Sequence, residues 1–178
     1  MLYTAATHDG PAAVRYPRGQ GPGTRIEQAM VALPIGRAEI RREGRSGLLL
    51  LGFGTMVAAC TPLAERLDAT LVNMRFVKPL DAELLGRLVP AHSAVVTIEE
   101  NVVAGGAGSA VNELLTASGI ARPSMNVGLP DTFIEHGSRD DCLEMAGLDA
   151  ASLERTITAF WRGLQPARPL VAAGHSAG

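Results

Sequence analysis

The stretch Gly47-Leu48-Leu49-Leu50-Leu51-Gly52-Phe53-Gly54 decides the fold. Its apolar residues do not alternate with polar ones, a pattern typical of a strand that is buried on both faces of a sheet. Thr55 follows directly and can cap a helix that runs through Leu67. Pro62 lies inside that helix, so we expect it to kink the helix or restart it. The stretch therefore predicts a central strand followed by a covering helix.

Strands and helices alternate along the rest of the chain from Pro34 onward. Further strands are predicted at Arg37–Arg42, Ala69–Phe76, Ala94–Ile98 and Ser124–Val127. Further helices are predicted at Asp81–Leu88, about Ser109–Ala117, Ser138–Ala146 and Asp149–Leu164. Asp81 is the expected cap of the first of these. Crossover connections of this length give a mostly parallel sheet with helices on both faces. We expect a three-layer α/β/α sandwich of about five strands, with Arg37–Arg42 as an antiparallel edge strand.

The first 34 residues contain many turn formers and have a different character. A short extended run, Ala12–Tyr16, ends at Pro17, which predicts a terminal strand followed by a linker. A lone edge strand leaves its amides and carbonyls unpaired, so we expect this part to be less ordered than the domain. At the other end, residues 165–178 are rich in Pro, Ala and Gly without periodicity, and a disordered tail is expected there.

Composition narrows the classes of function. The chain has 178 residues, 47% of them hydrophobic and 19% charged, with a formal net charge of −2. This balance suits one globular domain plus a remnant and offers no general attraction for nucleic acids or anionic membranes. No apolar run approaches the roughly 18 residues of a membrane span. The N-terminus lacks an export pattern, and Cys60 and Cys142 form no disulfide framework, so a cytoplasmic location is expected.

Two glycine-rich turns are candidate anion sites. Gly52-Phe53-Gly54 follows a strand and opens a helix, as a dinucleotide fingerprint does, but Val57 stands where a third small residue belongs. A tight turn between strand and helix is the favoured interpretation. The run Gly105–Ser109 offers backbone amides to an anion, but Glu99 and Glu100 just upstream would repel one. We favour a loop that lets the next helix pack closely or that meets a neighbouring domain.

Other patterns of catalytic residues are weak. Glu99 and Glu100 are adjacent, so at a strand end they point in opposite directions and cannot act as a facing pair. The sequence also lacks a Gly-x-Ser-x-Gly nucleophile motif. The four histidines have no metal-ligand spacing: His8, His92, His136 and His175. The domain by itself therefore contains no convincing catalytic constellation and no metal site.

The run Arg15-Tyr16-Pro17-Arg18-Gly19 is more informative. Two residues three apart on a strand lie on opposite faces, so one arginine can be structural while the other reaches the carboxyl edge of the sheet. A guanidinium group donates two parallel charge-assisted hydrogen bonds to a phosphate. These residues alone are equally compatible with two solvated arginines.

Several motifs in order resemble the 1-deoxy-D-xylulose-5-phosphate synthase family of the transketolase group. The motifs are Gly10–Gly19, Leu33–Gly36, Asn73–Asp81, Glu99–Asn101 with Gly105–Ser109, and Gly128–Asp131 with Phe133, Ile134, His136 and Gly137. They cover roughly residues 1–163. Transketolase and the pyruvate dehydrogenase beta-subunit are the alternatives within the group, and their motifs are less similar. A non-catalytic packing module and a stand-alone nucleotide-binding domain are the alternatives outside it.

The resemblance implies a division of the chain and a function. Residues 1–23 would be the end of a pyrimidine-binding domain, 24–34 a linker and 35–164 a transketolase C-terminal domain. The family condenses pyruvate with glyceraldehyde 3-phosphate, with loss of carbon dioxide, in isoprenoid and thiamine biosynthesis. By resemblance, Arg18 holds the phosphate of the aldehyde substrate, and Arg15 serves packing or a salt bridge.

The resemblance also implies what this chain leaves to other parts of the enzyme. Thiamine diphosphate and its magnesium would be bound outside this chain, by domains upstream of Met1, in a parent enzyme expected to be a homodimer. The chain is thus expected to be a fragment, a misplaced start or one product of a split gene, and to be inactive alone.

Overall fold

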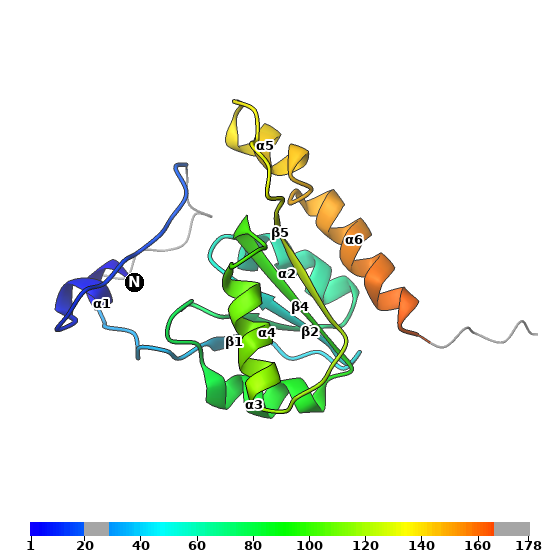
Figure 1. Cartoon of the computed structure of the whole chain (residues 1–178), viewed down its shortest axis with the longest axis horizontal. Coiled ribbons are helices and arrows are strands. Elements are labelled where there is room, and N and C mark those ends of the chain that lie inside the picture. The colour runs from blue at the N-terminus through cyan, green and yellow to red at the C-terminus, as the bar shows by residue number, and fades with distance from the viewer. Residues whose placement is uncertain (20–28, 166–178) are drawn as a thin grey trace, which may run out of the picture.

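A five-stranded mixed sheet forms the centre of the molecule in the computed structural model, which describes residues 1–19 and 29–165 (Figure 1). The strand order is β1-β3-β2-β4-β5. The strands are β1 Glu39–Arg42, β2 Leu48–Gly52, β3 Thr70–Asn73, β4 Ala94–Val102 and β5 Ser124–Leu129. All neighbouring strands are parallel except β1, which pairs antiparallel with β3 at the edge. The predicted sheet and its antiparallel edge strand are confirmed.

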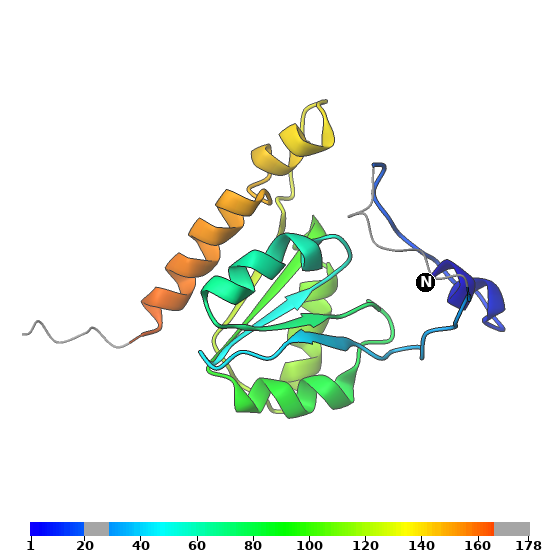
Figure 2. The same cartoon turned by 180° about the vertical axis from the view of Figure 1, so that it is seen from behind.

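Helices cover both faces of this sheet. The helices are α1 Leu2–Thr7, α2 Met56–Arg66, α3 Ala82–Ala91, α4 Ala107–Ala117, α5 Arg139–Met145 and α6 Ala150–Gly163. Helices α2 and α6 pack on one face, α3 and α4 on the other, while α5 lies beyond the carboxyl ends of the strands (Figures 1 and 2). Within the part of the chain that is described, no helix has the length and apolarity to cross a membrane. The three-layer α/β/α sandwich is therefore confirmed.

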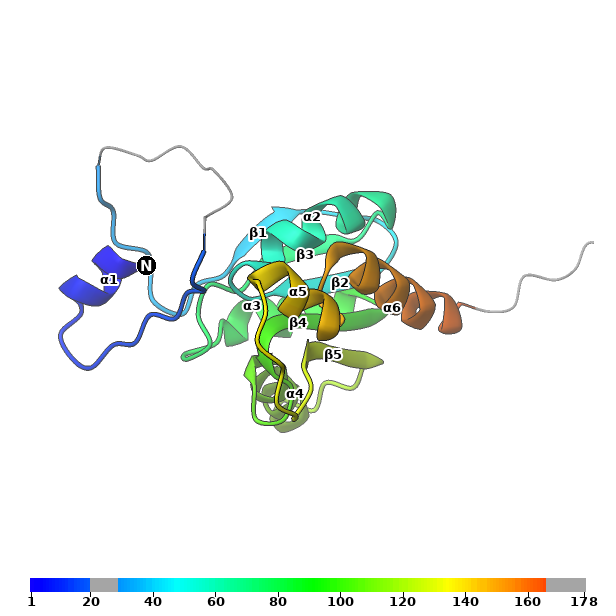
Figure 3. The ribbon, with the colours of Figure 1, turned by 90° about the horizontal axis from the view of Figure 1, so that it is seen from above.

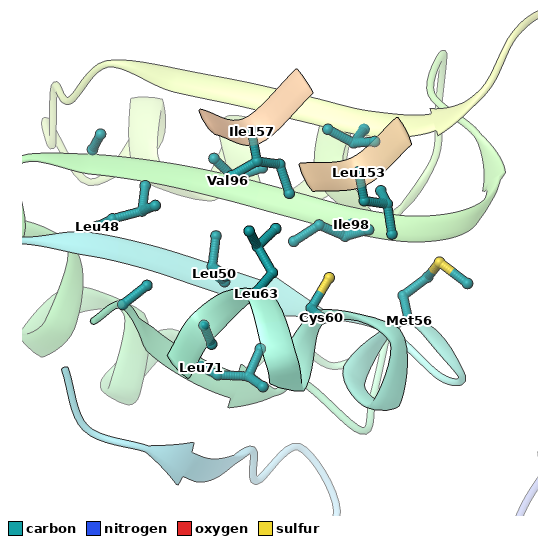
Figure 4. Close-up of a cluster of buried hydrophobic side chains, with 14 of the residues drawn as sticks. Leu48, Leu50, Met56, Cys60, Leu63, Leu71, Val96, Ile98, Leu153 and Ile157 are labelled. Atoms are coloured by element: carbon teal, nitrogen blue, oxygen red, sulfur yellow. The ribbon is translucent and has the colours of Figure 1, made fainter. Parts of the chain in front are cut away.

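The leucines of β2 divide the core into two halves. Leu48 and Leu50 point to one face and pack with residues of α2 and α6 (Figure 4). Leu49 and Leu51 point to the other face and pack with residues of α3 and α4. All four side chains are fully buried, because successive residues of a strand alternate between faces and both faces are covered. Burial in the first half also raises the pKa of the Cys60 thiol to about 12.

Local hydrogen bonds define where the helices begin. The Asp81 carboxylate accepts from the backbone N–H of Leu84 and caps α3, as predicted, and it also accepts from the N–H of Ala38 just before β1. Ser138 and Asp141 form a reciprocal capping box at α5. Hydrogen bonding to Ser138 lowers the pKa of Asp141. Asp149 caps α6.

Some predicted boundaries are wrong. Strand β3 ends at Asn73 instead of Phe76, because the Asn73 side chain accepts from the N–H of Arg75, whose φ of 57° breaks the extended conformation. Helix α2 continues through Pro62 as one helix. Pro62 and Ala58 are both exposed, so the Ala58 carbonyl that loses its intrahelical donor faces water. Helix α3 and strand β4 run further than predicted, to Ala91 and Val102.

The N-terminal prediction is wrong in a more important way. Residues 11–17 form no strand, and the short helix α1, which was not predicted, precedes them. An isolated strand needs a partner, and each strand of the described sheet is paired within residues 39–129. Helix α1 lies apart from the sandwich (Figures 1 and 2), where the Thr4 hydroxyl accepts from the N–H of Leu33.

The predicted linker and tail lie partly outside the described residues. Residues 20–28 and 166–178 are not described, which removes the first half of the linker at 24–34 and nearly all of the tail at 165–178. The remaining linker residues, 29–34, form neither helix nor strand.

Replacing Leu50 by alanine tests the two-sided burial of β2. Leu50 is 0% exposed, so Leu50→Ala should lower the free energy of unfolding by about 2–5 kcal/mol. Urea titration followed by circular dichroism measures this change. Leu2→Ala is the matched control, because Leu2 is 65% exposed and its loss should change stability little. Equal effects of the two substitutions would contradict the assignment of the core.

Candidate functional site

Polar side chains gather where the parallel strands end. Glu99 and Glu100 lie near the carboxyl end of β4, Thr55 follows β2, and Arg139 opens α5 above them. Ligands of open α/β sheets bind at this edge of the sheet. We therefore treat the carboxyl edge as the candidate functional site.

Glu99 points toward the layer of α3 and α4. It is only 3% exposed, and its two carboxylate oxygens accept from the backbone N–H groups of Ala107 and Gly108, each at 2.8 Å. These are N–H groups of the first turn of α4, which have no partner within the helix and carry the positive end of its dipole. The anion at this glycine-rich turn is therefore a carboxylate of the chain itself.

The glycines of this turn are required by close packing. A Cβ atom added to Gly106 would lie 2.6 Å from one Glu99 carboxylate oxygen and 2.3 Å from the Val102 carbonyl oxygen. A Cβ atom added to Gly108 would lie 2.3 Å from the Thr97 hydroxyl oxygen. Real Cβ atoms do not approach so closely. The geometry favours the interpretation of this run as a close-packing loop.

Glu100 points the other way, as expected for adjacent residues of a strand. Its carboxylate oxygen accepts from Arg139 Nη2 at 2.7 Å and from the Thr55 hydroxyl at 2.7 Å. Arg139 Nη2 also lies 3.2 Å from the Thr55 hydroxyl oxygen. The side chains of Arg139 and Glu100 are 34% and 26% exposed, so this ion pair is partly shielded from water. The three residues join α5, the end of β4 and the start of α2.

The turn Gly52-Phe53-Gly54 is filled by the protein. A Cβ atom on Gly52 would lie 2.9 Å from a methyl carbon of Val57, so the first turn of α2 already presses on the strand end. Gly54 has a φ of +59°, a conformation that glycine adopts without strain. This close contact favours the tight-turn interpretation over a dinucleotide fingerprint.

Arg18 and Arg15 are both exposed and lie in coil. The argument that placed them on opposite faces of a strand is therefore wrong, because no strand forms there. The coil nevertheless ends near α5 (Figure 3), where a Cβ atom added to Gly19 would lie 3.6 Å from Arg139 Cδ. The structure thus brings the residue after Arg18 to the candidate site.

The sequence did not reveal two arginines of this edge. Arg139 is 39 residues from Glu100 and 84 from Thr55, and no local pattern links them. Arg75 stands just beyond β3 in a left-handed conformation, with its guanidinium 2.8 Å from a Glu39 carboxylate oxygen. A non-glycine residue in this conformation is strained and often marks a functional site. Arg75 lies within the motif Asn73–Asp81, but no local pattern gave it a role.

The described residues of the carboxyl edge offer no set of ligands for magnesium. Among them, no three His, Cys, Asp or Glu side chains come together as a set of metal ligands. The two carboxylates at the edge are engaged by backbone amides and by Arg139. His136 is exposed on the segment before α5. No step of a cofactor reaction follows from these residues.

Replacing Glu99 by glutamine tests the internal carboxylate. An amide has one acceptor oxygen, so Glu99→Gln leaves one of the two N–H groups of α4 facing an NH₂ group. Because a hydrogen bond to a charged group contributes about 1.5–3 kcal/mol, we expect a loss of that order in the free energy of unfolding, measured by urea titration. Glu113→Gln, at an exposed site of the same helix, is the control. A loss no larger than in that control would show that the carboxylate does not hold α4.

Comparison with known proteins places the chain in a family. The model of the family described as "Transketolase, C-terminal domain" matches residues 36–153. The chain is 52% identical over 160 residues to a 1-deoxy-D-xylulose-5-phosphate synthase of Methylococcus capsulatus, and 55% identical over 157 residues to that of Methylobacillus flagellatus. These matches cover 90% and 88% of this chain and 25% of each relative, so the chain spans about a quarter of their length.

A solved structure agrees with this placement. The structure described as "Split gene transketolase, inactive beta4 tetramer" superposes with a TM-score of 0.67 and 31% sequence identity. The match covers 76% of this chain and 45% of that one. The matched residues include all five strands, helices α2 to α5 and the first residues of α6. The chain therefore belongs to the transketolase C-terminal domain family.

Proposed function

We propose that this chain is the C-terminal part of a 1-deoxy-D-xylulose-5-phosphate synthase, a transferase of the transketolase type. The observation that carries the proposal is 52–55% identity to curated synthases over about nine-tenths of the chain. The reaction would join pyruvate to glyceraldehyde 3-phosphate and release carbon dioxide, and its product would feed isoprenoid and thiamine biosynthesis. The 31% identity to a split-gene transketolase supports a related transketolase subunit as the second candidate.

The domains missing from this chain would complete the enzyme. Under the proposal, residues 1–23 end a pyrimidine-binding domain, 24–34 are a linker and 35–164 form the C-terminal domain. The rest of the enzyme comes either from the same polypeptide or from a second one, and the assembled enzyme is a homodimer. The similarity to a split-gene transketolase supports a second polypeptide as one form of this arrangement. The two free cysteines suit the reducing cytoplasm, where we place the enzyme.

Thiamine diphosphate and magnesium would be bound by those other domains. When bound, thiamine diphosphate supplies the carbanion chemistry of such reactions, while the protein orients the groups around it. The role proposed for residues 35–164 is to pack against the other domains and support the dimer.

Arg18 is the one residue of this chain that we propose contacts substrate. Its guanidinium would hold the phosphate of glyceraldehyde 3-phosphate by charge-assisted hydrogen bonds. Three features support this role: its exposure, the rigid Pro17 before it, and the approach of Gly19 to the carboxyl edge of the sheet.

The first test asks whether the chain needs the other domains. We expect the purified 178-residue chain to release no carbon dioxide from pyruvate when thiamine diphosphate and magnesium are added. Addition of the polypeptide encoded immediately upstream, if it carries thiamine-binding domains, should restore release and formation of the five-carbon sugar phosphate. Cofactor-dependent turnover by the chain alone would contradict the proposal.

The second test measures the role of Arg18 in the assembled enzyme. Arg18→Ala removes a charge-assisted hydrogen bond that contributes on the order of 1.5–3 kcal/mol, so the KM for glyceraldehyde 3-phosphate should rise by about tenfold to a hundredfold or more. Decarboxylation of pyruvate should change less. Arg15→Ala is the matched control, because Arg15 is exposed in the same coil. A larger effect of Arg15→Ala than of Arg18→Ala would reverse the assignment.

A further inference from the structure

Helix α5 is joined to the sandwich by few contacts. None of its residues is buried, and its apolar contacts with the core come from the partly buried Leu143 and from Ala146 just after the helix. Within the described part of the chain, every hydrogen bond from α5 to the sheet or to α2 starts at Arg139 Nη2. Segments with few buried contacts are those that open without unfolding of the whole domain.

The chain on both sides of α5 can act as a hinge. Residues 130–138, which lead from β5 into α5 (Figure 1), form neither helix nor strand, and all of them except Ile134 are exposed. On the other side, Gly147 has a φ of +69°, a left-handed conformation that glycine adopts without strain. Hinges are usually a few loop residues that absorb the change in backbone angles. Leu148, which follows directly, is 1% exposed and fixes the chain to the core where α6 begins.

A cavity of about 380 Å³ lies between α5, the first turns of α2 and the start of α6. Two residues that line it carry a buried polar atom with no hydrogen-bond partner among the described residues: Arg139 at Nε and Asp149 at Oδ2. A buried polar atom without a partner raises the free energy of the state that buries it, because it has lost its hydrogen bonds to water. Lifting α5 would return both atoms to water, which favours opening.

The guanidinium of Arg139 opposes this opening. Its Nη2 donates to the Glu100 carboxylate at 2.7 Å and lies 3.2 Å from the Thr55 hydroxyl oxygen. Glu100 is part of β4 and Thr55 follows β2, so both partners belong to the sandwich. The side chains of the ion pair are 34% and 26% exposed, and an ion pair with partly exposed members shifts an equilibrium by about fivefold at most. The contact is therefore strong enough to favour the closed position and weak enough to release it.

We propose that α5 is a hinged lid over the carboxyl edge, closed by the ion pair of Arg139 with Glu100 and opening between Gly137 and Gly147. In the open state, the Glu100 carboxylate, the Thr55 hydroxyl and the first turn of α2 face water. A charged group that competes for either member of the ion pair favours this state. The lid goes beyond the function proposed above and does not depend on it.

Hydrogen exchange of the 178-residue chain, followed by mass spectrometry in increasing urea, tests whether α5 opens by itself. Amides of α5 should exchange faster than those of β2, and their rates should depend little on urea, because a local opening exposes little surface. Amides of β2, whose residues are all buried, should follow the unfolding of the whole domain. A common rate with the same urea dependence for both elements would overturn the proposal.

Glu100→Gln tests the ion pair, because it keeps the shape of the side chain and removes its charge. It should speed the exchange of α5 amides by about twofold to fivefold. Glu154→Gln is the matched control, since Glu154 forms a comparable ion pair with Arg66, at 2.6 Å, that joins α2 to α6. This control should leave α5 unchanged. An unchanged rate in Glu100→Gln, or an equal rise in Glu154→Gln, would show that this ion pair does not close the lid.

Salt gives a second measurement that needs no substitution, and it decides if Glu100→Gln fails to fold. Raising sodium chloride from about 50 mM to about 500 mM screens a partly exposed ion pair. Amides of α5 in the unchanged chain should then exchange faster, while those of β2 keep their rates. Exchange of α5 that does not respond to salt would overturn the role of Arg139 and Glu100 in closing the lid.

Discussion

Two adjacent carboxylates near the end of β4 hold the carboxyl edge of this domain together. Because neighbouring residues of a strand point to opposite faces, Glu99 reaches the first turn of α4 while Glu100 reaches Thr55 and Arg139. One carboxylate thus serves each helical layer. The position of α4, the start of α2 and the attachment of α5 all depend on this pair.

Close packing at the glycine-rich turn gives the same edge its rigidity. Gly106 and Gly108 let the backbone of α4 approach Glu99 and Thr97 more closely than any side chain would permit. Glu99 satisfies N–H groups that would otherwise be buried without partners, and it complements the helix dipole. The turn resembles an anion-binding loop in its chemistry, but its anion is built into the fold.

Exposed apolar side chains are consistent with a larger assembly. Phe133, Tyr16 and Val77 are 104%, 72% and 55% exposed, although soluble domains usually cover most of their large apolar groups. Relatives four times as long contain further domains that this chain does not supply. The proposed enzyme would bury such groups where those domains meet this one.

The sequence by itself determined the sandwich, because the signals for it are local. These signals are the order and length of the apolar runs, the leucines of β2, and the helix caps at Asp81, Ser138 and Asp149. It could not determine the N-terminal segment, since a strand forms only where a partner strand exists. It also missed the contact between Arg139 and Glu100, which are far apart in the chain and meet only because α5 folds over the strand ends. The tertiary structure alone decided which charges met at the carboxyl edge, because ion pairing depends on distance in space and local sequence patterns do not encode that distance.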